Sequence, residues 1–290
     1  MFNDISGHIE WARVAPDKVV VATADRVWLY QPSSGNSSDL FAQPMSSTGS
    51  VATTQKLLDT SIILAKRAVS SSRPPAFSLM LWIWRLAGQY HLTHSAPQLL
   101  EEAAQRFAAA GRQTLAQWAA EKAVEERGHD RLALLDIQSL GYDAQAVVEA
   151  LVPPSAQVLM DYFTRSVQSP DPIGCVGYSY TMERLALTTG EEHIQAVEAL
   201  LPSGIKATRF LHVHSGVGSD VEHVQETIEM VSGLSPEERT RVAIACYETA
   251  LLRFSSSQEG YPTDEELQEV LKPLALHPQP QEEFESLLVR

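Results

Sequence analysis

The stretch Glu125-Glu126-Arg127-Gly128-His129-Asp130 lies late in the segment 97–140, whose apolar spacing predicts one long helix. On a helix with about 3.6 residues per turn, Glu126 falls on the same side as four apolar positions: Leu115, Ala119, Ala133 and Ile137. His129 shares this side because it follows Glu126 by three residues. The sequence therefore predicts that a carboxylate and an imidazole project together into an apolar interior, where polar groups need partners.

This Glu-x-x-His pair has two interpretations. Pairs of this kind that face the inside of a helical bundle hold iron or manganese. The same spacing also occurs in a capped or surface polar cluster that binds no metal. Metal-ligating side chains that face inward from other helices would favour the first interpretation.

The composition is that of an ordinary globular protein, with 290 residues, 44% hydrophobic and 20% charged. The net charge of −14 argues against nucleic acids and anionic membranes as partners. No apolar run reaches the length of about 18 residues that a membrane span needs, and no signal-peptide pattern opens the chain. Two cysteines, Cys175 and Cys246, are too few for a disulfide framework or a four-cysteine zinc site. We therefore expect a cytoplasmic protein.

Strand signals occur only in residues 1–50. The β-branched and aromatic segments 18–23 and 26–30 predict a hairpin, and the Ser/Gly/Asn/Pro-rich stretch 31–50 predicts a flexible linker. Residues 51–290 predict an all-α bundle. Its helices are expected at 54–70, 77–94, 97–140, 144–151, 155–167, 175–188, 191–201, 205–231 with an interruption at 216–218, 236–254 and in the tail after 263.

Two other predicted helices also direct metal-ligating side chains inward. Glu183 is the only acid of the helix 175–188 and shares its face with apolar and aromatic residues, where an acid is uncommon unless it is paired. Asp220 and His223 repeat the three-residue spacing of a carboxylate and an imidazole. Two such pairs and a lone glutamate, on three helices, form the oxygen and nitrogen donor set that suits iron or manganese.

This pattern resembles the heme-oxygenase-like diiron oxidases and oxygenases over about residues 55–255. The residues that carry the resemblance are Glu126, His129, Glu183, His214, Asp220 and His223. The resemblance implies a heme-oxygenase-like helical bundle, often dimeric, that binds two ferrous ions and uses O2 as cosubstrate. It also implies a small-molecule substrate, an amino or fatty acid, that is oxidised by decarboxylation, C–C cleavage or N-oxygenation.

The chain departs from the family pattern between His214 and Asp220. The family has His-x-x-x-Asp-x-x-His, whereas these two residues are six apart. On a straight helix His214 would face away from His223, so it can serve only if the helix opens at the glycines 216 and 218. His212 is the alternative on a straight helix. We favour His214 because it gives these glycines a purpose.

A second departure concerns the early helix, where the family often supplies a glutamate. The corresponding window, His91-Leu92-Thr93, contains no acid. His91 could replace it, with His94 in reserve. The alternative is that both histidines are simply polar residues at a helix end.

Lys122 and Tyr180 are candidate substrate-binding residues. Lys122 lies one turn before Glu126, where it could contact a substrate carboxylate or pair with a ligand acid. The alternative is that Lys122 extends outward to solvent. Tyr180 could line the same cavity with Tyr178 and Trp118, and core packing is the alternative for all three.

Two other classes of function compete with a diiron enzyme. One is a metal-free enzyme of the heme-oxygenase-like fold, which would keep the bundle without the full set of ligands. The other is a non-enzymatic helical binding protein, in which the acids and histidines form a solvated polar network. The two carboxylate–imidazole pairs favour the metal enzyme over both alternatives.

Overall fold

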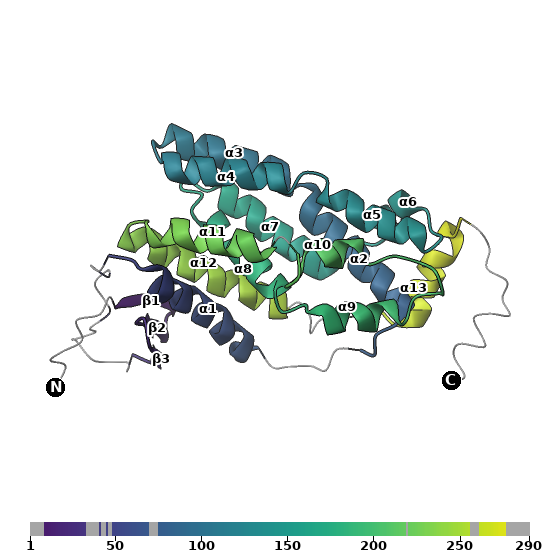
Figure 1. The fold of residues 1–290 in the computed structure, drawn as a ribbon, viewed down its shortest axis with the longest axis horizontal. Coiled ribbons are helices and arrows are strands. Elements are labelled where there is room, and N and C mark those ends of the chain that lie inside the picture. The colour runs from purple at the N-terminus through teal and green to yellow at the C-terminus, as the bar shows by residue number, and fades with distance from the viewer. Residues whose placement is uncertain are drawn as a thin grey trace.

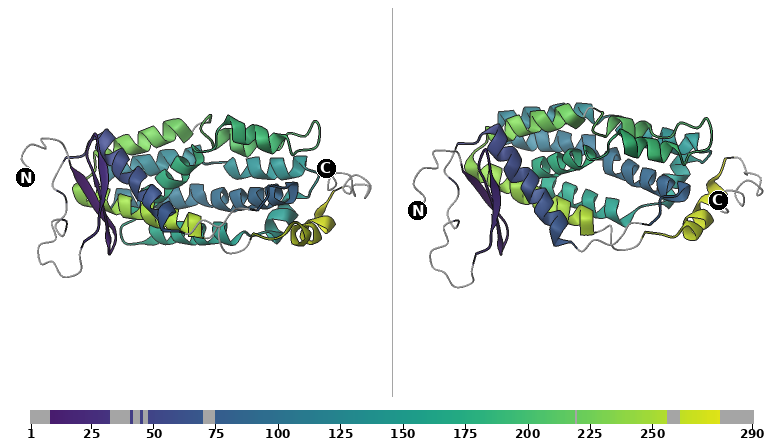
Figure 2. Two further views of the ribbon diagram at one scale, coloured as in Figure 1. Left: turned by 90° about the horizontal axis from the view of Figure 1, so that it is seen from below. Right: turned by 60° about the horizontal axis from the view of Figure 1, so that its bottom comes forward.

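The computed structural model describes residues 9–32, 41, 45, 48–69, 75–218, 220–255 and 261–276. A bundle of helices extends along one axis, and a small sheet lies across one end of it (Figures 1 and 2). The predicted all-α body with a β appendage at its amino-terminal end is therefore confirmed. No helix in the described part of the chain is both long and apolar enough to cross a membrane.

The sheet has three antiparallel strands, β1 (Glu10–Ala15), β2 (Lys18–Ala22) and β3 (Val27–Tyr30), in the order β1-β2-β3. The predicted hairpin corresponds to β2 and β3, and β1 is an additional strand. β1 was not predicted because a glutamate, Glu10, occupies one of its buried positions, where strand patterns normally have apolar residues. The predicted linker, 31–50, lies mostly outside the described residues.

Thirteen helices are present in the described ranges, and most of them match the predicted segments. They are α1 (Val51–Ala68), α2 (Leu79–His94), α3 (Ala96–Ala109), α4 (Gln113–Glu125), α5 (His129–Ser139), α6 (Ala144–Ala150), α7 (Pro154–Gln168), α8 (Gly174–Ala186), α9 (Glu191–Glu198), α10 (Arg209–Val213), α11 (Asp220–Ser232), α12 (Pro236–Ser255) and α13 (Asp264–Leu271). A short 3₁₀ turn, Lys272–Leu274, follows α13.

The predicted long helix 97–140 is wrong. The segment forms three helices, in which α3 and α4 pack against each other as a hairpin and α5 starts after a second break. At this second break Gly128 has φ +86°, a left-handed conformation that glycine adopts without a steric penalty. The apolar spacing runs on across both breaks because each of the three helices buries a face. Glu126 and Ala133 therefore do not share one helix.

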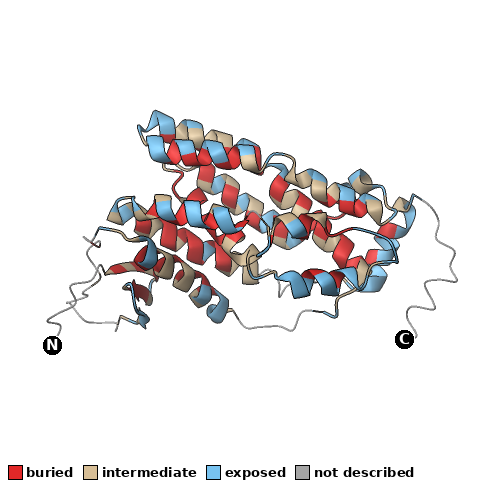
Figure 3. Cartoon of the chain, viewed as in Figure 1, coloured by how far each residue is buried: buried red, intermediate tan, exposed pale blue. Residues whose placement is uncertain are grey.

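The buried apolar side chains form two clusters, and Figure 3 shows buried residues in helices along the whole length of the bundle. The larger joins the sheet to α1, α3, α4, α7, α8, α11 and α12. The smaller joins α2, α5, α6, α9, α10 and α13. The chain crosses between the two clusters several times, and two of these crossings are the helix breaks between α4 and α5 and between α10 and α11, which Figure 1 places near the middle of the molecule.

A buried ion pair fastens the sheet to the bundle. The Glu10 carboxylate of β1 lies 2.9 Å from Nε of Arg239 on α12, and both side chains are almost completely buried, at 0% and 1% exposed. The hydroxyl of Thr54 on α1 donates a hydrogen bond of 3.0 Å to the same carboxylate. One buried acid therefore joins β1, α1 and α12.

We predict that Arg239→Met lowers the free energy of unfolding by about 3–5 kcal/mol, because it leaves the Glu10 carboxylate buried without its counter-ion. Urea denaturation followed by circular dichroism measures the change. The exposed pair of Asp17 and Lys18, 3.2 Å apart, is the matched control, and Asp17→Asn should cost less than about 1 kcal/mol. An Arg239→Met protein as stable as the Asp17→Asn protein would contradict the prediction.

Candidate metal centre

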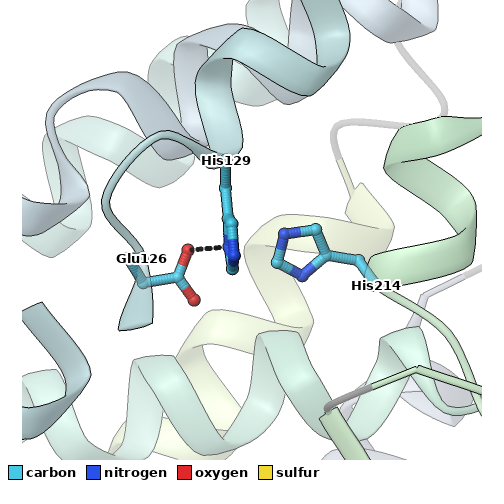
Figure 4. A group of neighbouring side chains, drawn as sticks. All are labelled: Glu126, His129 and His214. Atoms are coloured by element: carbon cyan, nitrogen blue, oxygen red, sulfur yellow. Dashed lines mark hydrogen bonds and ion pairs between the residues drawn. The ribbon is translucent and has the colours of Figure 1, made fainter. Parts of the chain in front are cut away.

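Three side chains that could hold a metal ion meet at the two helix breaks (Figure 4). Glu126 directly follows α4, His129 is the first residue of α5, and His214 directly follows α10. One ligand atom from each lies within 4.8 Å of the others. Nδ1 of His129 lies 3.1 Å from Oε2 of Glu126, and the rings of His129 and His214 meet edge to face with centroids 4.7 Å apart.

Gly128 explains why Glu126 and His129 lie close together. The left-handed turn at Gly128 separates α4 from α5, and the backbone N–H of His129 bonds to the carbonyl of Glu126 at 3.3 Å. The two side chains therefore meet across a turn and not on successive turns of a single helix. Their predicted proximity is confirmed, whereas the predicted continuous helix through both residues is wrong.

Asp136 sets the position of α10. The Asp136 carboxylate, on α5, accepts hydrogen bonds from the backbone N–H groups of Arg209 and Phe210 at 3.2 and 3.0 Å. It also accepts one from the Arg209 guanidinium at 2.9 Å. Burial nevertheless raises the pKa of Asp136 above its usual range, and these donors oppose that effect. Because α5 begins with His129 and α10 is followed by His214, this contact holds the two imidazoles in place.

The loop between α10 and α11 brings Asp220 back to His214. A Cβ atom on Gly218 would lie 2.0 Å from the carbonyl oxygen of Val213, so only glycine fits this close approach. Asp220 then begins α11 with Oδ1 at 3.3 Å from Nδ1 of His214. The opening predicted for this region is present, and it lets His214 face the same group as Asp220.

His212 lies elsewhere. Its side chain is half-exposed, and its Nε2 lies 3.4 Å from a carboxylate oxygen of Glu198 on α9. Of the two histidines considered for this position, the structure brings His214 to the group.

A second set of ionisable side chains adjoins the first. The ammonium of Lys122 lies 3.0 Å from Oε2 of Glu125 and 3.2 Å from Oε1 of Glu183. Nε2 of His223 lies 3.3 Å from Oε2 of Glu125, and its Nδ1 lies 3.9 Å from Oδ1 of Asp220. Lys122 thus pairs with a candidate ligand acid. Glu125 was not predicted as a site residue, although its position directly before Glu126 could have suggested it.

The pKa values show how the charges of this region offset one another. Burial raises the pKa of Glu183 to about 8, and the negative charges of Glu126 and Asp220 act in the same direction while Lys122 opposes them. Burial would also raise the pKa of Glu126, but the hydrogen bond from His129 and the charge of His214 outweigh it and lower that pKa. Burial would lower the pKa of His214, but Asp220 and Glu126 outweigh it and raise that pKa.

Several polar atoms here are buried without a hydrogen-bond partner among the described residues. They include Oε2 of Glu183, Nε2 of His214 and Oδ2 of Asp220. Buried polar groups are otherwise almost always satisfied, because leaving one unpaired costs about 1–3 kcal/mol. Carboxylate oxygen and imidazole nitrogen are donors that iron and manganese accept. The residues present therefore fit a metal ion.

The early helix supplies no ligand to this group. Nε2 of His91 lies 2.9 and 3.1 Å from the carbonyl oxygens of Val148 and Leu151, at the end of α6, and is therefore directed away from Glu126. Helix ends leave carbonyl groups without an intrahelical partner, and His91 satisfies two of them. His94 pairs with Asp130 at 2.8 Å and is half-exposed. Neither histidine replaces the family's early glutamate.

The three aromatic candidates have separate roles. The Tyr180 hydroxyl donates to Asp59 at 2.9 Å, a contact that ties α8 to α1 and not to the cavity. Trp118 donates from its ring to Thr227 at 3.1 Å in the core. Tyr178 lines the cavity beside the ionisable group. Among these three, the structure thus places Tyr178 where Tyr180 was expected.

A cavity of about 440 Å³ opens beside the ionisable group. Polar side chains line one part of it, namely Lys122, Glu126, Glu183, His214 and Asp220. Apolar and aromatic side chains line much of the remainder, including Leu92, Leu100, Phe163, Met182, Phe210, Leu211 and Phe254, and further polar side chains such as Gln89, Thr189 and Arg253 complete it. This combination of a mostly apolar wall and a few convergent polar groups is typical of a small-molecule site.

No protein-family model and no curated protein matches the chain. Among solved structures, it is similar to a domain of unknown function with a heme oxygenase-like fold from Shewanella denitrificans, at 20% identity and a TM-score of 0.51, over 82% of this chain and 92% of that one. It is also similar to a TenA homolog from Pseudomonas syringae pv. tomato, at 13% identity and a TM-score of 0.54, over 73% of this chain and 93% of that one. At these identities the likeness concerns the fold alone, and the fold of this chain is heme-oxygenase-like.

Proposed function

We propose that this chain is a non-heme diiron oxygenase or oxidase that uses O2 to oxidise a small amino or fatty acid. Decarboxylation, C–C cleavage and N-oxygenation are the reactions expected of it. The proposed ligands are Glu126, His129, Glu183, His214, Asp220 and His223. The observation that carries the proposal is the convergence of the partly buried Glu126, His129 and His214, beside a buried Asp220 whose Oδ2 has no hydrogen-bond partner among the described residues.

The two parts of the site differ in how ready they are to bind an ion. Glu126, His129 and His214 already converge. Bound iron would supply the activation of O2, and the Glu126 carboxylate would offset its charge. The acid of the second part, Glu183, is paired with Lys122 at 3.2 Å. The Lys122 ammonium competes with an ion for the Glu183 carboxylate, so the first part is expected to fill first.

The walls of the cavity would favour an oxidation by excluding water from the reacting group. Phe163, Phe210 and Leu211 contribute apolar surface to the same cavity as the ionisable group. A cavity of about 440 Å³ has room for a small organic acid. Lys122 is the basic side chain beside the ligand acids, and it would contact a polar group of the substrate at this end of the cavity after releasing Glu183.

The alternative is a metal-free enzyme of the same fold. One observation favours it, because the buried ammonium of Lys122 already balances Glu125 and Glu183 where a second cation would otherwise be needed. The early-helix acid is also absent from the predicted window. Iron titration separates the two proposals.

We predict that the metal-free protein binds between about one and two Fe(II) per chain in an anaerobic titration. His214→Ala should abolish the tighter site, because it removes one of three converging donors. His212→Ala is the matched control, since that histidine lies two residues away and faces Glu198. Uptake of less than about one iron per chain by the unaltered protein would rule out the diiron proposal.

We predict that Lys122→Met strengthens binding of the second ion by about tenfold or more, because an ammonium beside Glu183 no longer competes for its carboxylate. The same anaerobic titration measures this constant. Lys206→Met, which changes an exposed lysine, should leave it unchanged. A second constant that is equal or weaker in Lys122→Met would show that Lys122 does not control this part of the site.

We predict that Gly218→Ala weakens Fe(II) binding by about tenfold or more while the helical content is retained. The added methyl group would displace the backbone at Val213 and separate Asp220 from His214. Circular dichroism and the iron titration together measure these effects. Gly190→Ala, at an open position before α9, is the control. Normal iron affinity in Gly218→Ala would mean that the loop does not position the ligands.

A further inference from the structure

A second cavity, of about 250 Å³, lies beside the first and is basic. Two guanidinium groups line it, Arg85 from α2 and Arg253 from α12, together with His193 and Tyr261. None of the described residues that line this cavity is an aspartate or a glutamate. In a chain with 36 acidic and 22 basic residues, a cavity with this lining is unusual and calls for an explanation.

The two arginines lie close enough for their charges to interact. Burial lowers the pKa of Arg85, and the like charge of Arg253 lowers it further, although the Tyr261 hydroxyl opposes this. Burial also lowers the pKa of Arg253. The Arg85 guanidinium stacks 4.9 Å from the centre of the Phe77 ring, and Tyr261 packs against Trp84. Two guanidinium groups on the wall of one cavity attract an anion more strongly than either would alone.

The amino-terminal end of α7 adds to the positive character of this cavity. Pro154 begins this helix of 15 residues, and Ser155 and Ala156 also line the cavity. The first turn of a helix carries a partial positive charge and favours anions. Arginine is also the side chain best suited to carboxylate and phosphate, because its planar fork matches their oxygens.

The two cavities adjoin each other. Gln89, Leu92, Thr189, Leu211 and Arg253 line both of them, so Arg253 stands at their boundary. A molecule with its charged group at the arginines could therefore extend past Leu92 and Leu211 along apolar surface toward Glu126 and His214. This path leads from the basic cavity to the candidate metal centre.

We propose that Arg85 and Arg253 bind the oxyanion group, carboxylate or phosphate, of an organic acid whose apolar part extends into the larger cavity. The anion site itself does not depend on iron. Its role in presenting an oxidisable substrate rests on the proposed function.

Isothermal titration calorimetry of the full-length, metal-free protein tests the proposal with acetate, hexanoate and inorganic phosphate. Hexanoate should bind at least about tenfold more tightly than acetate, because its methylenes enter the apolar cavity. Hexanoate that binds no better than acetate or inorganic phosphate would overturn the proposal, since the site would then accept a small free anion only.

Arg85→Gln should weaken hexanoate binding by at least about tenfold, because it removes a charge-assisted contact. Arg85→Lys keeps the positive charge but lacks the planar guanidinium. Its hexanoate affinity should lie between those of the unaltered protein and Arg85→Gln, which distinguishes a loss of recognition from a loss of folding. Arg131→Gln, at an exposed arginine of α5, is the matched control and should bind as the unaltered protein does. Hexanoate affinity that survives Arg85→Gln would overturn the proposal.

Iron binding and anion binding can fail independently. A protein that takes up Fe(II) but shows no arginine-dependent binding of hexanoate would contradict the anion site alone. A protein that binds hexanoate through Arg85 but takes up no iron would contradict the diiron function alone. Both measurements use the same metal-free preparation.

Discussion

The structure depends on one constraint: the ionisable side chains that lie between its two hydrophobic cores must each have a partner. Four acids, three histidines and one lysine share the region where the halves of the bundle meet, and each has a charged or titratable neighbour within 4 Å. Such groups remain inside a protein only if they are paired or ligated. The two helix breaks satisfy this need, because they direct side chains from four helix ends into one place.

Particular residues explain what could be predicted from the sequence and what could not. The helical spacing predicted most helices, and the three-residue spacings predicted that Glu126 and His129 would be neighbours. The break at Gly128 was hidden because apolar residues continue in phase on both sides of it. Asp136 was missed even though it follows His129 by seven residues and so lies on the same side of α5.

Contacts between distant segments account for the other differences. His91 was a reasonable candidate by its place in the chain, but the carbonyl groups at the end of α6 are its partners. Tyr180 is directed to Asp59 by the packing of α8 on α1. Helical periodicity specifies the side of a helix on which a residue lies, but it does not specify which neighbour that side meets. The basic cavity has the same origin, because its arginines are 168 positions apart in the sequence.

The division of the bundle into two cores has a mechanical consequence. Glu126 and Asp220 belong to elements of the larger core, whereas His129 and His214 adjoin the smaller one. A slight bend of the long axis would change the spacing of these four groups without repacking either core. An ion held by all four would link the two cores and restrict their relative motion. Binding of an ion at the centre would then make the whole bundle stiffer, and loss of the ion would make it more flexible.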